Sequence, residues 1–415
     1  MSAPRPTVAA VIAQAADAYQ ARYGTVPAQR RIFRDLVACR TAALGGHKQQ
    51  CTQCGHEVLA YNSCRNRHCP TCQGPARARW LAARAAELLP VPYFHVVFTL
   101  PAPLGPLALH NKRVVYGLLF RAVARTLRTI ARDPQHLGAD LGVLAVLHTW
   151  GQTLQHHPHL HCVVPGGGLA PDGTRWVACH PHFFLPVRVL SRHFRHTFLR
   201  LLRSAYQHGK LRCRGSLARL ADPATWHRWL HELERAEWVV YAKPPFGGPA
   251  QVLKYLARYT HRVAISNQRL VAVADGRVTF RWQDYAHDHR PRTMTLDAVE
   301  FLRRFLLHRL PRGFQHIRHY GFLGNRRRAA ALARIRALLG APPGPDAPEP
   351  ADRGEEGAPR DACPQCGTAA SSWWRPSRPS TPLTHASARP HGIHRSGGGD
   401  ALDLPAPPPP GGTLR

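Results

Sequence analysis

The sequence predicts an α/β (α+β) protein, in which a helical, cysteine-rich N-terminal unit precedes a larger domain of mixed strands and helices. Three observations support this prediction. Six of the eleven cysteines lie before residue 90. Strand-like and helix-like segments alternate from residue 91 to residue 330. The segment 331–415 becomes rich in Pro and Gly, and we expect a linker and a disordered tail with a lone Cys-x-x-Cys motif.

The N-terminal unit, residues 1–90, is expected to be helical on both sides of its cysteines. Apolar residues recur at helical spacing within 8–44, and the alanine- and arginine-rich run 75–89 is also typical of a helix. The intervening segment carries the cysteines, so we expect a small metal-binding domain that contacts DNA.

In the second domain, residues 91–330, apolar and β-branched runs predict strands, and Asp275-Gly276 between two alternating runs predicts a hairpin at 269–282. The strand-like runs are 93–100, 142–150, 159–167, 175–183 and 237–243. We expect helices at 111–132, 190–208, 249–259 and 295–309.

The charge of the chain favours a polyanionic partner. The 56 basic residues against 24 acidic ones give a formal charge of +32, which favours nucleic acid. A GC-rich genome also enriches arginine, but it does not explain the shortage of acidic residues. No signal peptide or membrane span is recognisable, so we expect a cytoplasmic protein whose cysteine pairs bind metal and do not form disulfides.

Two Cys-x-x-Cys motifs have the spacing of a four-cysteine zinc ribbon. They are Cys51 with Cys54 and Cys69 with Cys72. Each motif can hold one side of a tetrahedral ion, and zinc would stabilise a unit this small without redox chemistry. We therefore predict structural Zn²⁺ at these four residues.

The same neighbourhood leaves a second zinc site open. Its possible ligands are Cys39, His47, Cys64 and His68, of which one or two could instead support the first site. Arg65 and Arg67 lie between candidate ligands, where a rigid loop would present two guanidinium groups to DNA phosphates.

Histidines alternate within the stretch HHPHLHC, residues 156–162. In an extended strand, His159 and His161 project to one face, whereas Leu160 points to the other. His157 shares their side but precedes Pro158, which favours the start of the strand there. The pattern indicates either a metal-binding pair or a polar strand edge, and the imidazoles alone do not identify the ion.

A pair of tyrosines stands at helical spacing in the stretch VLKYLARYTHRVAIS, residues 252–266. Tyr255 and Tyr259 are four residues apart, so they share one face of a helix. Such a pair is commonly core packing. The neighbouring cations Lys254, Arg258 and Arg262 argue instead for a charged ligand.

These motifs together resemble the IS91-type transposases, which are HUH endonucleases (U is a hydrophobic residue). The resemblance rests on FHVVFTLP, on TWGQTLQHHPHLHCVVPGGG, on QVLKYLARYTHRVAISNQRL and on the cysteine motif, and it runs from about residue 10 to 330. It implies an N-terminal zinc-binding domain followed by an HUH-type nuclease domain with an antiparallel sheet and two tyrosines. It further implies an insertion-sequence transposase associated with the bacterial nucleoid.

The resemblance also implies a mechanism. His159 and His161 would hold Mg²⁺ or Mn²⁺ at the scissile phosphate, with Gln152 as a third ligand and His157 and His261 as rivals for that position. Tyr255 or Tyr259 would attack phosphorus and leave a 5′-phosphotyrosine. Rejoining would need no ATP or other nucleotide cofactor, because the covalent link conserves the energy of the phosphodiester.

The implied partner is single-stranded DNA at the element ends and at the target. Lys254, Arg258 and Arg262 would neutralise its phosphates. Two alternatives remain at this point. One is a zinc-dependent DNA-binding regulator without catalysis. The other is a zinc metallohydrolase with His157, His159 and His161 as ligands.

Overall fold

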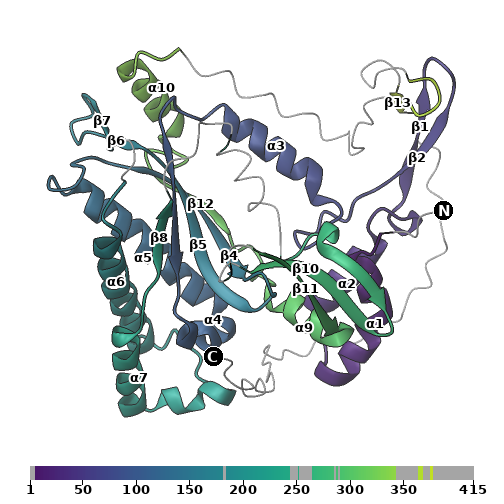
Figure 1. The fold of residues 1–415 in the computed structure, drawn as a ribbon, viewed down its shortest axis with the longest axis horizontal. Coiled ribbons are helices and arrows are strands. Elements are labelled where there is room, and N and C mark those ends of the chain that lie inside the picture. The colour runs from purple at the N-terminus through teal and green to yellow at the C-terminus, as the bar shows by residue number, and fades with distance from the viewer. Residues whose placement is uncertain are drawn as a thin grey trace, which may run out of the picture.

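The computed structural model describes residues 5–180, 184–243, 251, 264–284, 287, 290–342, 363–367 and 374–376. Within these ranges, helices surround antiparallel sheets, and cysteine clusters involve the N-terminal region, which confirms the predicted mixed fold (Figure 1). The helices are α1 (Val8–Tyr23), α2 (Pro27–Ala38), α3 (Gln73–Ala85), α4 (Gly105–His110), α5 (Lys112–Arg132), α6 (Val187–Gln207), α7 (Pro223–Arg235), α9 (Ala298–Leu307) and α10 (Arg328–Leu338).

The strands form four sheets among the described residues. They are β1 (Gly46–Cys51), β2 (Glu57–Tyr61), β3 (Tyr93–Thr99), β4 (Gly142–Trp150), β5 (His156–Pro165), β6 (Gly167–Leu169), β7 (Trp176–Ala178), β8 (Val240–Lys243), β9 (Leu270–Ala274), β10 (Arg277–Asp284), β11 (Arg290–Asp297), β12 (Ile317–Gly321) and β13 (Trp374–Pro376).

The central sheet has five strands in the order β12-β4-β5-β3-β8. Phe94, Val96 and Phe98 alternate along β3 and face the large hydrophobic core, to which α5 and α6 contribute (Figure 1). Leu160 and Cys162 of β5 face the same way. The period of two in a strand explains why residues between these apolar positions reach the opposite face. That opposite face carries the histidines.

Several predicted elements are confirmed with small changes in their bounds. The hairpin forms between β9 and β10, and Asp275 and Gly276 at its turn both have positive φ, 51° and 69°. Two positive φ values match the twist of the flanking strands, which Asn-Gly and Asp-Gly pairs accommodate. The predicted helix at 8–44 is two helices separated by a short turn at Gly24. Of the predicted helix at 249–259, the structure describes only residue 251.

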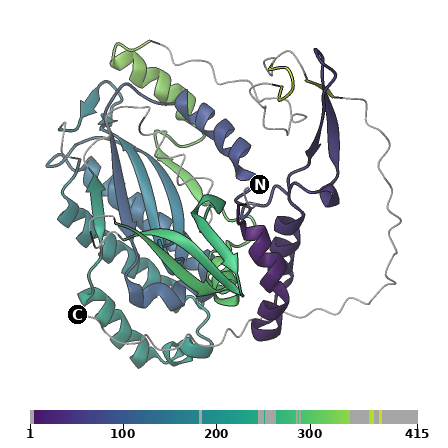
Figure 2. The ribbon, with the colours of Figure 1, turned by 45° about the vertical axis from the view of Figure 1, so that its right-hand side comes forward.

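A second hydrophobic cluster joins the N-terminal helices to the β9-β10-β11 sheet. Ile12 of α1 and Phe33 of α2 share this cluster with Phe280 of β10 and Phe301 of α9. Figures 1 and 2 show α1 and α2 lying beside α9 and this sheet. The predicted division at residue 90 thus runs through one shared core, since the N-terminal helices bury their apolar faces against residues much later in the chain.

The β1–β2 hairpin lies away from both cores. In Figures 1 and 2 it stands apart from the central sheet, and β13 from the end of the chain lies beside it. In contrast, α3 packs Trp80 and Leu81 against Tyr93, Leu144 and Val163 of the central sheet. One end of the histidine-bearing face is therefore covered by α3.

Candidate metal centres

Strand register brings three histidines together on one face of the central sheet. His159 lies opposite His148 of β4, and His161 lies opposite Val146 of the same strand. Directly paired residues point to the same side of an antiparallel sheet, and so do residues two apart. His148, His159 and His161 consequently share the face that is turned away from α5 and α6.

The three imidazoles are close enough to bind one ion. One ring nitrogen from each lies within 4.8 Å of the others. The Nε2 atoms of His159 and His161 are 3.0 Å apart, and the ring centroids of His148 and His161 are 4.3 Å apart. Two nitrogens at right angles on an ion, with bonds of about 2.1 Å, would be about 3.0 Å apart. The spacing of the pair therefore fits a shared cation.

Hydrogen bonds on the outer side of the rings orient them for this role. His159 Nδ1 donates to the carbonyl oxygen of His157 at 2.7 Å, and a carbonyl only accepts, so His159 Nε2 carries the lone pair. His161 Nδ1 lies 2.8 Å from Nε2 of His95. With the proton of this contact on His95, His161 Nε2–H donates to His159 Nε2. With that proton on His161, both Nε2 atoms present lone pairs to each other, which is the arrangement that two ligands of one cation adopt.

Burial keeps these imidazoles neutral. Desolvation lowers the pKa of His159 to about 4 and the pKa of His95 to about 3, and it holds the pKa of His161 well below its ordinary value. Neutral imidazole is the form that binds metals. At neutral pH the rings of His159 and His161 are thus ready to act as ligands.

The loop between β4 and β5 is held against the second hydrophobic core by packing and hydrogen bonds. Leu154 is fully buried in that core, although its backbone has a positive φ of 64°, which a leucine rarely adopts. Arg269 donates to the carbonyl oxygen of Gln152 at 2.6 Å, and Arg304 donates to that of Thr153 at 3.1 Å. His308 Nε2 donates to the carbonyl oxygen of Leu154 at 3.0 Å. These contacts fix the two strands that supply the histidines.

His148 was not predicted from the sequence. Its only local signal is a histidine near the end of an otherwise apolar strand, and such a residue reveals nothing about its partner across the sheet. Gln152, the predicted third ligand, lies in the β4–β5 loop, and its role as a ligand stays a prediction. His157 is exposed; its carbonyl oxygen accepts the hydrogen bond from His159, and the two rings lie with their centroids 5.1 Å apart, but His157 is not part of the group of three. His156 turns to the helical side, where its Nε2 meets the Tyr116 hydroxyl at 2.8 Å.

The predicted nucleophiles and several predicted cations lie outside the described residues. These are Tyr255, Tyr259, Lys254, Arg258 and Arg262, together with His261. The structure therefore adds nothing on their placement, and their roles stay predictions.

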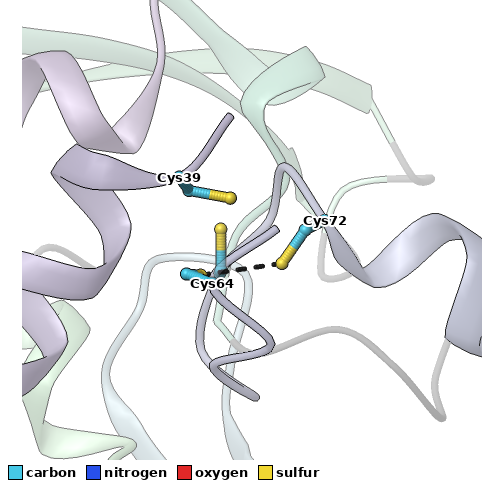
Figure 3. A group of neighbouring side chains, drawn as sticks. Cys39, Cys64 and Cys72 are labelled. Carbon is cyan, nitrogen blue, oxygen red and sulfur yellow. Dashed lines mark hydrogen bonds between the residues drawn. The ribbon is translucent and has the colours of Figure 1, made fainter. Parts of the chain in front are cut away.

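Four cysteines near the N-terminus form the first thiol cluster, at residues Cys39, Cys64, Cys69 and Cys72. Cys39 ends α2, Cys72 precedes α3, and the other two lie on the loop between β2 and α3. Figure 3 shows the sulfur atoms of Cys39, Cys64 and Cys72 converging, and the Cys64 and Cys72 sulfurs are 3.7 Å apart. A tetrahedral ion with Zn–S bonds of about 2.3 Å needs sulfurs about 3.8 Å apart.

The electrostatics of this cluster also favour a cation. Hydrogen bonds from the Cys64 and Cys72 thiols lower the pKa of Cys69 to about 2, whereas the pKa values of Cys39, Cys64 and Cys72 are raised, so the negative charge of the cluster is placed on Cys69. Thiolate is the form that binds zinc. The cluster lies within the second hydrophobic core.

The structure does not bring the two Cys-x-x-Cys motifs together as predicted. Cys51 and Cys54 do not join Cys69 and Cys72, and they lie instead with Cys363 and Cys366 from the end of the chain. The physical reason is the direction of the β1–β2 hairpin, which carries its cysteines away from the start of α3 (Figure 1). Spacing along the chain cannot reveal this direction.

The possible second zinc site is only partly assembled as predicted. Of its four possible ligands, Cys39 and Cys64 lie with Cys69 and Cys72 in the first thiol cluster. The two histidines, His47 and His68, are not part of this cluster. His47 Nε2 lies 3.3 Å from the Gln49 side chain, and His68 Nδ1 lies 3.1 Å from Asn66 Oδ1. The ring of His68 is buried, and burial lowers its pKa to about 3.

The two predicted DNA-contacting arginines lie on the surface beside the first thiol cluster. Arg65 and Arg67 are exposed, and Arg65 has a positive φ of 51°. Arg67 donates to the carbonyl oxygen of Phe314 at 3.1 Å, which links this loop to the central domain.

Comparison with known proteins agrees with this architecture. The profile of the family described as "Transposase zinc-binding domain" matches residues 11–100, and that of the family described as "Putative transposase" matches residues 142–330. The "Putative transposase y4qJ" of Sinorhizobium fredii (strain NBRC 101917 / NGR234) is 58% identical over 374 residues, which are 88% of this chain and 94% of the relative. The "Transposase for insertion sequence element IS801" of Pseudomonas savastanoi pv. phaseolicola is 31% identical over 320 residues, or 75% of this chain and 74% of that protein.

The chain belongs to the IS91 family of transposases. The resemblance seen in the sequence motifs is thereby confirmed. No solved structure matches the transposase significantly.

Family membership agrees with two features of the transposase. The zinc-binding domain and its cysteine cluster support structural zinc in the N-terminal region. A transposase acts on DNA, which agrees with the large positive charge of the chain. Among the described helices, none is both long and apolar enough to cross a membrane.

Proposed function

We propose that the transposase nicks and rejoins single-stranded DNA at the ends of its element by an HUH mechanism, as in rolling-circle transposition. The observation that carries this proposal is the convergence of His148, His159 and His161, each of which has a ring nitrogen within 4.8 Å of the other two, with the lone pair of His159 Nε2 turned toward the group. The hydrogen bonds that hold the β4–β5 loop in place also support the proposal, because catalytic groups need rigid positioning.

The metal of this site would be Mg²⁺ or Mn²⁺. His148, His159 and His161 would hold it, and Gln152 is a further candidate ligand on the adjoining loop. When bound, the ion would draw negative charge from the scissile phosphate. His95 would keep the ring of His161 in place through the hydrogen bond at 2.8 Å.

The proposed nucleophiles are Tyr255 and Tyr259. One phenolic oxygen would form a bond to phosphorus while the bond from phosphorus to the 3′ oxygen breaks, and that oxygen would take up a proton. The product is a 5′-phosphotyrosine with a free 3′-hydroxyl, and the reverse attack rejoins the strand without a nucleotide cofactor. Two tyrosines would allow two DNA ends to be held together.

The proposed DNA contacts come from two regions. Lys254, Arg258 and Arg262 would neutralise phosphates beside the tyrosines. Arg65 and Arg67 would contact the DNA backbone from the zinc-binding region, and both are exposed there. Such a protein would work at the bacterial nucleoid.

For the structural zinc of the N-terminal region, we propose the ligand set Cys39, Cys64, Cys69 and Cys72. Their sulfur separation and the low pKa of Cys69 support it. This ligand set differs from the set expected from motif spacing, because it contains Cys39 and Cys64 in place of Cys51 and Cys54.

Covalent capture tests the function. Purified transposase with Mn²⁺ and single-stranded DNA from the element ends should form an adduct that survives SDS, and mass spectrometry should locate it on Tyr255 or Tyr259. The double variant Tyr255→Phe/Tyr259→Phe should form none. An adduct in that variant, or none in the unaltered protein, would overturn the tyrosine mechanism.

The histidine variants separate catalysis from binding. His159→Ala and His161→Ala should abolish the adduct but leave DNA affinity nearly unchanged, whereas His231→Ala on exposed α7 should change neither. DNA binding without adduct formation under every metal tested would instead favour the non-catalytic zinc-dependent regulator. The metallohydrolase alternative would have His148 in place of His157 as its third ligand, because the histidine group contains His148 and not His157.

A further inference from the structure

The motif Cys-Pro-Gln-Cys-Gly at residues 363–367 has no role in the function described so far. It lies beyond the matched families, which end at residue 330. Cys363 is nevertheless only 2% exposed. Burial of a thiol so far from either hydrophobic core calls for a local partner.

That partner is the β1–β2 hairpin. The Cys363 sulfur lies 3.7 Å from that of Cys54, and the Cys366 sulfur lies 3.8 Å from that of Cys51. All four sulfurs lie within 4.8 Å of one another. These separations match the edge of about 3.8 Å of a zinc–thiolate tetrahedron. They are far longer than the bond of about 2.05 Å in a disulfide.

The two halves of this cluster have the same local structure. Each is a Cys-x-x-Cys-Gly segment, and the final glycines, Gly55 and Gly367, have positive φ values of 71° and 72°. In each half the glycine N–H donates to the carbonyl oxygen of the first cysteine, at 3.0 Å from Gly55 to Cys51 and at 2.9 Å from Gly367 to Cys363. This shared turn presents both sulfurs of a half to one side. Cys69-Pro-Thr-Cys72 is followed by Gln73 and lacks the glycine.

The backbone beyond the second half also joins the hairpin. Residues Trp374–Pro376 form β13, which pairs antiparallel with β1, so that Cys51 lies opposite Trp374. The hairpin becomes a three-stranded sheet in this way. A segment from the end of the chain thus contacts the N-terminal region through both its thiols and its backbone.

The hairpin itself has little else to stabilise it. Of the residues in β1 and β2, Cys51 alone is buried, and Leu59 is 64% exposed. An isolated two-stranded hairpin is marginal in water, and small units without a core need a metal or a disulfide. The thiol cluster fills this need only if an ion occupies it.

We propose that Cys51, Cys54, Cys363 and Cys366 form a second structural zinc site, which fastens the C-terminal segment to the β1–β2 hairpin. The site is discontinuous, since its halves are 309 residues apart between Cys54 and Cys363. The hairpin can therefore complete its metal site only after residue 366 has been made. A chain truncated before residue 363 would keep the first zinc and lose the second.

Zinc content of the full-length protein tests this inference. The unaltered protein should contain two zinc ions per chain, one for each thiol cluster. Cys363→Ser/Cys366→Ser should contain one, and so should Cys51→Ser/Cys54→Ser. The variant with all four changes should also contain one, because both pairs belong to one site. Cys179→Ser/Cys213→Ser, outside both clusters, should keep two. Two zinc ions in the Cys363→Ser/Cys366→Ser variant would overturn the proposal.

A second measurement addresses the fastening itself. A protease site inserted between residues 345 and 358 lets the C-terminal fragment be cut from the folded protein. In zinc buffer, the cleaved C-terminal fragment should remain bound to the rest of the protein, and it should dissociate when a chelator removes the zinc. In the variant Cys51→Ser/Cys54→Ser, it should dissociate as soon as the chain is cut. Separation in zinc buffer from the otherwise unaltered protein would refute the link. Cys363→His/Cys366→His should retain the second zinc, because imidazole replaces thiolate as a ligand.

Discussion

Two desolvated histidines, the half-buried His156 at the start of β5 and the buried His308 after α9, should make the transposase lose stability in mild acid. His156 lies against the Tyr116 hydroxyl, and His308 lies between Thr149 Oγ1 at 3.2 Å and the Leu154 carbonyl oxygen. Desolvation lowers the pKa of His156 to about 2 and that of His308 to about 3. Their unfolded pKa is about 6.5.

The size of the effect follows from these pKa values. Between the folded and the unfolded pKa, the unfolded chain binds more protons, so the free energy of unfolding rises with pH and falls on acidification. From pH 7 to pH 5, each histidine should remove about 2 kcal/mol, and the pair about 4 kcal/mol. A loss of this size is comparable with the whole stability of many domains, about 5–15 kcal/mol.

Urea denaturation at pH 7 and pH 5 would measure this loss, with the glutamine variants His156→Gln and His308→Gln compared with the unaltered protein. Glutamine keeps hydrogen-bonding groups but cannot become charged, so each variant should lose about 2 kcal/mol less on acidification. Any loss of stability caused by zinc release in acid should be the same in the unaltered protein and in the variants, so it cancels when their free energies of unfolding are compared. His231→Gln on exposed α7 is the matched control and should behave like the unaltered protein. An unchanged pH dependence in both His156→Gln and His308→Gln would refute the reasoning.

Three further predictions concern the site and its scaffold. His95→Ala should raise the Mn²⁺ concentration needed for adduct formation about 10- to 100-fold, with part of the affinity restored in His95→Gln and no change in metal-free DNA binding. Leu154→Ala should lower the free energy of unfolding by about 2–5 kcal/mol in urea titrations, because it empties a fully buried position and alanine keeps the strain of the positive φ; a loss below 1 kcal/mol would refute tight packing at this position. Gly321→Ala should sharply reduce the yield of folded protein, since a Cβ there would collide with the Leu141 backbone oxygen, whereas Gly313→Ala, also at positive φ but in open space, should cost about 1 kcal/mol.

Local sequence patterns were sufficient for helices α3, α5, α6 and α9, the β9–β10 hairpin and the shared face of His159 and His161, but they did not predict α7 or α10. Each depends on a short-range period, of 3.6 residues in a helix or two in a strand, and neighbouring residues determine that period. The apolar partner Leu160 faces the core as the alternation requires. Zinc was also predictable, because Cys-x-x-Cys motifs constrain two ligands by covalent geometry alone.

The partners of these local units depended on tertiary structure. His148 joins the histidine pair only because β4 pairs with β5 in a register that sets it opposite His159. Cys51 and Cys54 meet Cys363 and Cys366, and not Cys69 and Cys72, because the hairpin points away from α3. The shared Cys-x-x-Cys-Gly pattern of the two halves was visible in the sequence, yet it says nothing about contact. The sequence thus determined which residues could act as ligands, and the folded chain decided which of them share an ion, because ligand distances depend on how distant segments pack.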